Sequence, residues 1–320
     1  MNNQMNSVPT KNLKFYLHLD FLEELSSPHT RLSYQNDILQ FLDYISRQFE
    51  DINTYQDIEK KHFVRFRNYL QQIGGKQGDP CAPKTIARKL AALSSYFRFL
   101  SEKNIITANP VSSIKRPRSA VLVPTNALTR EQVIDLLHSI DENKKAGKMH
   151  KALLVMFFTT GLRKSEILNL RRKDYSEFNQ HKIVKYHGKG GKKGQKILHP
   201  LCIDALDEYL NWMKNQSREH IPEDWLFQPT QNPFNPTMLN KPLNPKTINE
   251  ILDYYAMKIK LTFKISPHSA RATFIGELLD AGVDIYAVAQ EVNHSSVKTT
   301  QEYDKRRKNF LDSPVYKLKY

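Results

Sequence analysis

The helical spacing of apolar residues over the first third of the chain is the strongest constraint on its fold. The clearest set recurs in steps of four and three residues and consists of Ile86, Leu90, Leu93, Phe97 and Leu100. This period matches one face of an α-helix, and Pro83 is a typical start signal for it. Similar patterns over 27–49, behind the capping residue Ser27, and over 61–73 predict two more helices. Because no strand signal interrupts these patterns, we expect an all-helical first domain.

Prolines mark the end of this first domain. Pro110, Pro117 and Pro124 favour an extended chain and therefore indicate a linker. Helical patterning resumes at Thr129, which forms a capping box with Gln132. The expected organisation is a helical domain over 1–118, a linker over 119–126 and a second domain over 127–320.

The second domain combines helices with a few strands. Residues 149–160 form an apolar helix, and Gly161 suits the left-handed end of that helix. Residues 182–200 predict two short strands around a turn rich in glycine and lysine. Helical patterns return over 200–320, apart from a loop rich in proline and asparagine at 228–245. The predicted fold class is mainly α with a small β-sheet, in which a helical domain precedes a mixed α/β domain.

Positive charge is concentrated in one stretch of the chain. The formal net charge is +15, yet residues 1–83 carry 9 Lys/Arg against 10 Asp/Glu. Residues 84–118 carry 8 Lys/Arg against a single acid, Glu102. Such a balance indicates a polyanionic partner, nucleic acid or a membrane surface, although a merely soluble basic protein shares it. The candidate DNA-binding residues are Lys84, Arg88, Arg98, Arg116, Lys192 and Lys193.

Several classes of protein fit the sequence poorly. It shows no signal peptide and no apolar stretch long enough to span a bilayer. Its two cysteines, Cys81 and Cys202, lie far apart and form no C-x-x-C, which argues against a disulfide framework or a zinc site. The glycines and lysines of 188–194 do not have the spacing of a P-loop. We therefore expect a cytoplasmic protein without a metal site.

Two cationic residues of the second domain are candidates for phosphate binding. Arg163 follows the glycine turn, and Glu166 lies three residues on, within reach of its guanidinium. Lys189 lies in the turn between the two expected strands, in a stretch with six lysines and no acid over 182–196. On their own, these features are more typical of a surface Arg–Glu pair and a solvated hairpin tip.

The remaining candidates lie near the C-terminus. His268 and Arg271 are three residues apart at the start of a helix marked by Ser266 and Pro267, where free N–H groups favour anions. His294 precedes Tyr303 by nine residues. A tyrosine hydroxyl titrates near pH ~10, so as a nucleophile it needs nearby cations or a base. The chain has fifteen tyrosines, and a tyrosine taken alone is most often a packing or surface residue without a chemical role. Only the neighbours of Tyr303 distinguish it.

The candidates share an order along the chain that resembles the active site of the tyrosine recombinase (phage integrase) family, including Xer-like recombinases. The set comprises Arg163, Lys189, His268, Arg271, His294 and Tyr303. The resemblance extends to both domains and implies a helical SAM-like core-binding domain followed by a tyrosine recombinase catalytic domain. It implies a site-specific DNA recombinase, an enzyme that needs neither ATP nor a divalent metal and has no cofactor.

The resemblance also implies a role for each residue. Tyr303 attacks a DNA phosphodiester and forms a 3′-phosphotyrosine. Arg163 and Arg271 neutralise the non-bridging oxygens, and Glu166 supports Arg163. Lys189 protonates the leaving 5′-oxygen, His268 assists proton transfer and His294 donates a hydrogen bond to the phosphate.

Two positions depart from the family pattern. The family usually has glycine before the second histidine, where this chain has Asn293, a residue type that tolerates the left-handed conformation. A second histidine often follows the His-x-x-Arg pair, where this chain has Ala272, which affects local packing rather than the catalytic set.

Other functions remain open from the sequence. A type IB topoisomerase-like enzyme shares the chemistry, but the helical first domain favours a recombinase. A non-catalytic DNA-binding protein of the same fold has no need for the complete set, and no aromatic motif supports RNA binding. The expected partners are duplex DNA with a specific site and a homo-tetramer on paired sites, with a second recombinase or a DNA-bending protein as options. Integration, excision and dimer resolution are equally compatible with the sequence.

Overall fold

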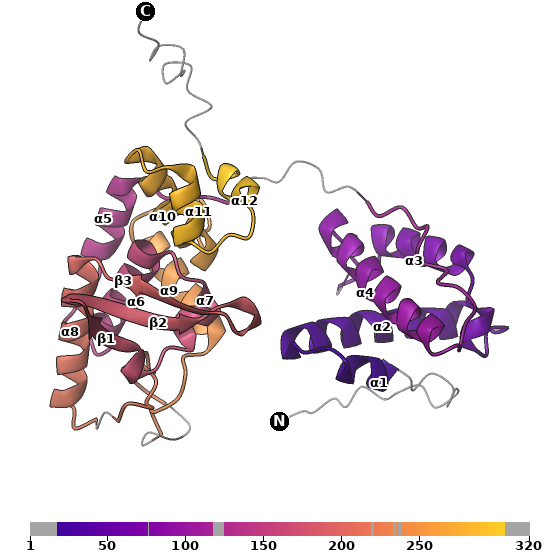
Figure 1. Cartoon of the computed structure of the whole chain (residues 1–320), viewed down its shortest axis with the longest axis horizontal. Helices are drawn as coiled ribbons and strands as arrows, with labels where there is room; N and C mark the ends of the chain where they lie inside the picture. Colours follow the sequence, from indigo (N-terminus) through magenta and orange to yellow (C-terminus); the bar gives the residue numbers. More distant parts are fainter. Residues whose placement is uncertain are drawn as a thin grey trace, which may run out of the picture. The chain divides into compact units, whose positions relative to one another are not determined.

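The chain divides into two compact units, residues 1–122 and 123–320 (Figure 1). The structure is a computed structural model that describes residues 18–75, 77–117, 125–218, 221–232, 235 and 238–304. Most of the expected linker, residues 119–124, lies outside the described residues. Each unit has its own apolar core and is described separately.

The first unit is a helical bundle with an aromatic centre. Its elements are α1 (His18–Glu23), α2 (Pro28–Gln48), the 3₁₀ helix η2 (Tyr55–Asp57), α3 (Lys60–Gln72) and α4 (Pro83–Glu102). Ser27 caps α2 by accepting the Thr30 N–H. The ring of Phe63 on α3 lies 4.5 Å from that of Phe41 on α2 and 4.9 Å from that of Phe97 on α4. The helical stripes of the sequence therefore meet in one core.

The second unit places helices around a three-stranded sheet. Its helices are α5 (Arg130–His138), α6 (Gly147–Thr160), α7 (Lys164–Leu168), η3 (Arg172–Asp174), η4 (Lys189–Gly191), α8 (Pro200–Asn215), α9 (Pro245–Lys258), α10 (Pro267–Asp280), α11 (Ile285–Glu291) and α12 (Val297–Gln301). The strands are β1 (Tyr175–Phe178), β2 (His181–His187) and β3 (Lys193–Ile197). They pair antiparallel in the order β1-β2-β3. The predicted fold class, mainly α with a small sheet, is confirmed.

Helix α6 is the centre of the second unit. Its residues 152–158 are all buried, and it packs against α8 and α10. It ends at Gly161, which has a φ of 59° and lies against Phe274 of α10. A Cβ at this glycine would lie 2.4 Å from the Phe274 ring. Both the left-handed backbone and the close helix contact therefore require glycine, and they bring the residues after α6 next to α10.

A second, smaller apolar cluster lies at the end of this unit. It is formed by Ile275 and Leu279 of α10, Val288 of α11 and Val292 just after α11, and Tyr303 packs against it. Helices α10, α11 and α12 lie next to one another in sequence order (Figure 1). No helix within the described residues is long and apolar enough to cross a membrane.

Candidate active site

Arg163 is held at the start of α7 by Glu166. The Glu166 carboxylate accepts the main-chain N–H of Arg163 at 2.7 Å and its Nη1 at 2.8 Å. Glu166 is 3% exposed, whereas the Arg163 side chain is 33% exposed. A buried carboxylate that grips one edge of a guanidinium fixes its orientation while the other edge faces outward. The sequence suggested this contact, and the structure places the two groups together.

Arg271 is buried near the first turn of α10. Its Nη1 donates to the carbonyl of Gly161 at 2.5 Å, and its Nη2 donates to the carbonyl of Val292. Only 4% of the residue is exposed. Burial, and then the positive charge of Arg163, lower the pKa of Arg271 to about 10, so it remains charged at neutral pH. Arg271 is thus a buried cation that lies close to a second cation, Arg163.

Both arginines reach the turn that precedes His294. Arg271 bonds to the carbonyl of Val292, and Arg163 Nη2 lies 3.5 Å from the carbonyl of Asn293. Asn293 has a φ of 51°, as the sequence led us to expect for a residue that tolerates the left-handed region. The turn therefore presents consecutive carbonyls to the two guanidinium groups and directs His294 toward them.

His294 is neutral and anchored by a threonine. Its Nδ1 lies 2.8 Å from the hydroxyl of Thr300, which is fully buried. Burial, together with the charges of Arg271 and Arg163, lowers the pKa of His294 to about 4. A neutral imidazole has one N–H, and when the Thr300 hydroxyl donates to Nδ1 that hydrogen is on Nε2. The ring can then donate one hydrogen bond to an anion.

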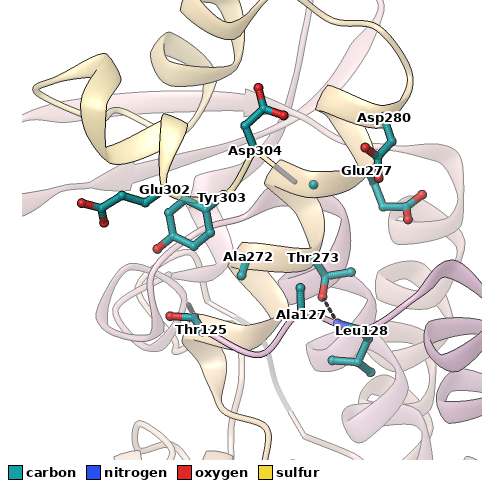
Figure 2. A pocket seen from close by; sticks show the side chains of 11 residues that line it. Thr125, Ala127, Leu128, Ala272, Thr273, Glu277, Asp280, Glu302, Tyr303 and Asp304 are labelled. Atoms are coloured by element: carbon teal, nitrogen blue, oxygen red, sulfur yellow. Dashed lines mark hydrogen bonds between the residues drawn. The ribbon is translucent and has the colours of Figure 1, made fainter. Parts of the chain in front are cut away.

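Tyr303 follows α12 and stacks on His294. Their ring centroids lie 6.1 Å apart with an interplanar angle of 21°. Tyr303 also borders a cavity of about 200 Å³ between α10 and residues 125–128 (Figure 2). The N–H of Leu128 donates to Thr273 of α10 at 2.8 Å on this side of the unit. Four carboxylates contribute to the cavity lining, from Glu277, Asp280, Glu302 and Asp304.

The hairpin residue Lys189 is the first residue of η4, between β2 and β3. Its side chain lies outside the described part of the chain. The neighbouring Gly188 is close to the phosphate candidates, because a Cβ there would lie 3.5 Å from Oε1 of Glu166. The backbone that carries Lys189 is thus brought next to the Arg163–Glu166 pair.

His268 and Arg271 occupy the same end of α10 but have different environments. Ser266 caps this helix by accepting the Ser269 N–H, as expected from the sequence. His268 is exposed, whereas Arg271, one turn on, is buried. The pair therefore offers one group to solvent and one to the interior.

The candidate DNA-binding residues are exposed in both units. Lys84, Arg88 and Arg98 lie on α4 of the first unit. Arg88 is also tied to buried Asp37 of α2 through a two-nitrogen ion pair, and Lys89 joins the same carboxylate at 2.9 Å. Part of the basic stretch therefore serves the packing of α4 against α2. The other exposed candidates are Arg116, Lys192 and Lys193.

Sequence reasoning missed four residues that shape the site. Thr300 holds His294, and Tyr186 accepts a hydrogen bond from the amide of Asn293. Lys196 of β3 is buried and bonds to Glu291 at 2.6 Å. Only Thr300 had a visible signal, its place between His294 and Tyr303. The Lys196–Glu291 pair joins residues 95 apart in the sequence, and no local sequence pattern predicts it.

Among the described residues, no group of three or more His, Cys, Asp or Glu side chains could hold a metal ion. The charged groups of the site are instead the two arginines and Glu166. The two arginines outnumber the single carboxylate, so this cluster suits an anionic substrate better than a cation.

Comparisons with known proteins agree for both units. Residues 126–309 match the phage integrase family, and residues 14–104 match the phage integrase N-terminal SAM-like domain. The tyrosine recombinase XerC of Pelotomaculum thermopropionicum is 30% identical over 295 residues, which cover 90% of this chain and 93% of that protein. The XerC of Myxococcus xanthus is 29% identical over 294 residues, 91% of each chain.

Solved structures show the same fold. The XerH site-specific recombinase in a post-cleavage complex with palindromic difH substrate has a TM-score of 0.69 at 21% identity, covering 90% of this chain and 80% of that one. A lambda integrase dimer bound to a COC′ core site has a TM-score of 0.65 at 17% identity, covering 92% of this chain and 94% of that one.

Proposed function

We propose that this chain, which belongs to the phage integrase family, is a site-specific DNA recombinase that cleaves and rejoins duplex DNA through a 3′-phosphotyrosine intermediate. The observation that carries this proposal is the convergence of Arg163 and Arg271 on the turn before His294. Two fixed cations, a neutral imidazole and a tyrosine hydroxyl are the groups that phosphoryl transfer to tyrosine requires.

The chemistry proceeds by two matched transfers. The Tyr303 hydroxyl oxygen attacks the phosphorus of one strand, and the bond to the 5′-oxygen breaks as the new P–O bond forms. A 5′-hydroxyl then attacks the phosphotyrosine and restores the diester while the tyrosine leaves. Each step exchanges one P–O ester bond for another, so strand exchange needs no external energy source.

The arginines stabilise the charge that develops on the phosphate. Each terminal nitrogen of a guanidinium has two hydrogens, and each Nη of Arg271 uses one of them on a carbonyl. The second hydrogen on each nitrogen is available for a non-bridging oxygen. Arg163 offers the edge opposite to Glu166. An anion bound here also relieves the repulsion between the two guanidinium groups.

The proton transfers are assigned to two further residues, and two others have supporting roles. Lys189 protonates the leaving 5′-oxygen as the general acid, and His268 assists proton transfer from the solvent side. The Nε2–H of His294 donates a hydrogen bond to the phosphate, since its lowered pKa keeps the ring neutral. Glu166 supports Arg163 without touching the substrate.

Formation of a covalent adduct tests the nucleophile. A nicked suicide substrate, which loses a short fragment after cleavage, is incubated with the protein in EDTA and denatured with SDS. We expect an SDS-resistant DNA adduct that Tyr303→Phe abolishes without loss of DNA binding. Tyr286→Phe, which changes an exposed tyrosine on α11, is the matched control and keeps the adduct. An adduct that persists in Tyr303→Phe removes the assignment.

The domain roles follow from the exposed charges. We assign DNA binding to the domain over 1–118 and catalysis to the domain over 127–320, joined by residues 119–126. Lys84, Arg98 and Arg116 in the first, and Lys192 and Lys193 in the second, face solvent and suit contacts to phosphates. Arg88 contributes less, because its guanidinium is shared with Asp37.

Salt dependence of binding separates these contacts. Replacing Lys84 or Arg98 with Gln lowers the slope of log affinity against log salt by about 1 each, if each neutralises one phosphate. Arg88→Gln lowers the slope by less but reduces stability. Equal slopes for wild type and the Lys84 and Arg98 variants would remove these residues from the DNA surface.

Assembly and biological setting complete the proposal. The protein acts in the cytoplasm on duplex DNA, as a tetramer on paired sites, and its substrate decides between integration, excision and dimer resolution.

The apolar segment 310–320, which lies outside the described residues, docks on a neighbouring protomer. Deleting it should leave binding to a single site intact but abolish cooperative binding to paired sites. Unchanged cooperativity would exclude this role.

A further inference from the structure

Two side-chain contacts join the β2–β3 hairpin to the turn that carries His294. On β2, the Tyr186 hydroxyl accepts a hydrogen bond from the side-chain amide of Asn293. On β3, the Lys196 ammonium donates to both the main-chain carbonyl and the carboxylate of Glu291. Tyr186 and Lys196 are both buried, so these contacts lie on the inner face of the hairpin.

The strand register explains why both contacts point the same way. Val184 pairs with Lys196 and Tyr186 with Gly194, so the side chains of these positions share one face of the sheet. A Cβ at Gly194 would lie 2.6 Å from the Tyr186 ring. The glycine therefore lets the Tyr186 ring lie across β3 and brings its hydroxyl to Asn293.

Each contact involves an unusual feature of the chain. Asn293 stands where glycine is usual, and its left-handed backbone carries a side chain that is used. Lys196 is a buried ammonium whose pKa is lowered by burial, while Glu291 opposes that shift. A buried charge is retained only when its partner is well placed. Glu291 is half exposed, so the cost of desolvation falls mainly on the Lys196 ammonium, on the hairpin side of the pair.

The hairpin is also the element that carries Lys189. Tyr186 lies three residues before Lys189, and η4 closes on itself through the Gly188 N–H and the Lys192 carbonyl at 2.7 Å. Any rotation of β2 and β3 relative to the turn therefore moves Lys189 relative to Arg163, Arg271 and His294. Because proton transfer depends steeply on distance, such a movement changes the rate of the step that Lys189 serves.

We propose that Tyr186 and Lys196, with their partners Asn293 and Glu291, are positioning residues that fix the Lys189 hairpin against the phosphate site. This proposal rests on the proposed function, because it assigns the general acid to the hairpin. Loss of either contact leaves the arginines in place and slows protonation of the leaving group. The contacts touch neither the DNA nor the reacting atoms.

A substrate whose leaving group needs no proton separates positioning from general stability. Cleavage is measured in preformed full-chain complexes with two suicide DNAs, one with a normal 5′-oxygen and one with a 5′-bridging sulfur. Tyr186→Phe and Lys196→Met should slow cleavage of the oxygen substrate about ten- to a hundredfold. The same variants should cleave the sulfur substrate within about threefold of wild type. Equal slowing on both substrates, or no slowing, overturns the proposal.

Two controls make the outcome specific. Tyr175→Phe removes a hydroxyl from the same sheet that bonds to Asp207 at 2.9 Å, away from the turn, and should cleave both substrates normally. Asn293→Gly keeps a residue suited to the positive φ and removes only the amide, so it should match Tyr186→Phe. A normal rate in Asn293→Gly would show that the Tyr186 hydroxyl does not act through Asn293, and it would overturn the pairing of these two residues.

The test also distinguishes failure of this inference from failure of the proposed function. Lys189→Ala should be rescued by the sulfur substrate. If it is not, Lys189 is not the general acid, and hydrogen exchange of the 188–193 amides in the full chain then decides the positioning claim. Faster exchange in Tyr186→Phe and Lys196→Met, but not in Tyr175→Phe, supports it, and unchanged exchange refutes it.

Discussion

The arginine pair and the tyrosine segment of the same site are built very differently. Arg271 is enclosed between the end of α6 and the turn after α11, and Arg163 is gripped by a buried carboxylate. Tyr303 follows a helix of five residues, stacks on His294 and packs on a four-residue cluster apart from the main core. The two arginines are thus held by several hydrogen bonds, whereas within the described residues Tyr303 is supported by a ring stack and a small cluster.

This difference has a chemical reason. Preorganised donors contribute most when they do not move as charge develops. On the proposed function, the nucleophile stays attached to one strand while another strand approaches, which suits a segment supported outside the main core. The site therefore joins a rigid half, which holds the two arginines, and a tyrosine half, which rests on the small cluster, and each half has its own experimental signature.

Loss of either arginine should give the largest effect. Arg163→Ala and Arg271→Ala should each slow cleavage in the bound complex by about 10²–10³-fold, as expected for loss of one preorganised donor. Arg271→Ala should also lower the melting temperature, because it leaves two buried carbonyls without their donor. Single-turnover cleavage and thermal unfolding check both. If DNA affinity falls and bound-complex cleavage stays normal, the arginines are ordinary anchors.

A backbone substitution at Gly161 should destabilise the rigid half. Gly161→Ala should destabilise the protein by about 1–3 kcal/mol, because the residue has a φ of 59° and its Cβ would meet the Phe274 ring. Urea unfolding of the full chain measures this cost. Gly282→Ala, another positive-φ glycine with no neighbour near its Cβ, is the control and should cost less. Equal costs would mean that strain alone, and not the α6–α10 contact, requires Gly161.

The tyrosine half can be perturbed without unfolding it. Thr300→Val keeps the buried shape and removes the hydroxyl that holds His294, so cleavage should fall about five- to tenfold, the value of one hydrogen bond. DNA affinity should be unchanged. Thr299→Val, at the neighbouring partly buried position, serves as the control. A full rate in Thr300→Val would show that the His294 ring needs no anchor.

The smallest expected effect is the pH dependence that comes from His294. His294 has a pKa near 4 in the folded chain, below its ordinary value of 6.5, so folding favours the neutral ring. The stability it contributes is present above pH 6.5 and declines as pH falls toward 4. NMR titration of the DNA-free protein should therefore show no His294 protonation between pH 8 and about 6. A titration midpoint near 6.5 would contradict the burial of the ring beside the two arginines.

The local parts of the fold were predictable from the sequence. Caps at Ser27, Thr129 and Ser266 and the glycine end of α6 all formed where the sequence placed them, because each depends on residues within one helical turn. The strand β1 was missed. It is a short edge strand with its last two residues exposed, and it lacks the alternation that identifies a half-buried strand.

Long-range contacts were not predictable in the same way. The Arg88–Asp37 ion pair joins residues 51 apart, so a basic helix face that suggested a phosphate surface is partly used inside the unit. Placement of Arg163 beside Glu166 was accessible, because the two are three residues apart. The burial of Arg271, by contrast, depends on two distant carbonyls, and its neighbours in sequence give no sign of them.

Helix α10 belongs to both halves of the site, and this sharing couples them. Its first turn holds Arg271 against the end of α6, while Ile275 and Leu279 farther along support α11 and Tyr303. Arg271 also bonds to the carbonyl of Val292 at the end of α11, so α11 touches both the arginine and the cluster under Tyr303. A shift of α11 relative to α10 therefore disturbs the arginine pair and the tyrosine segment together.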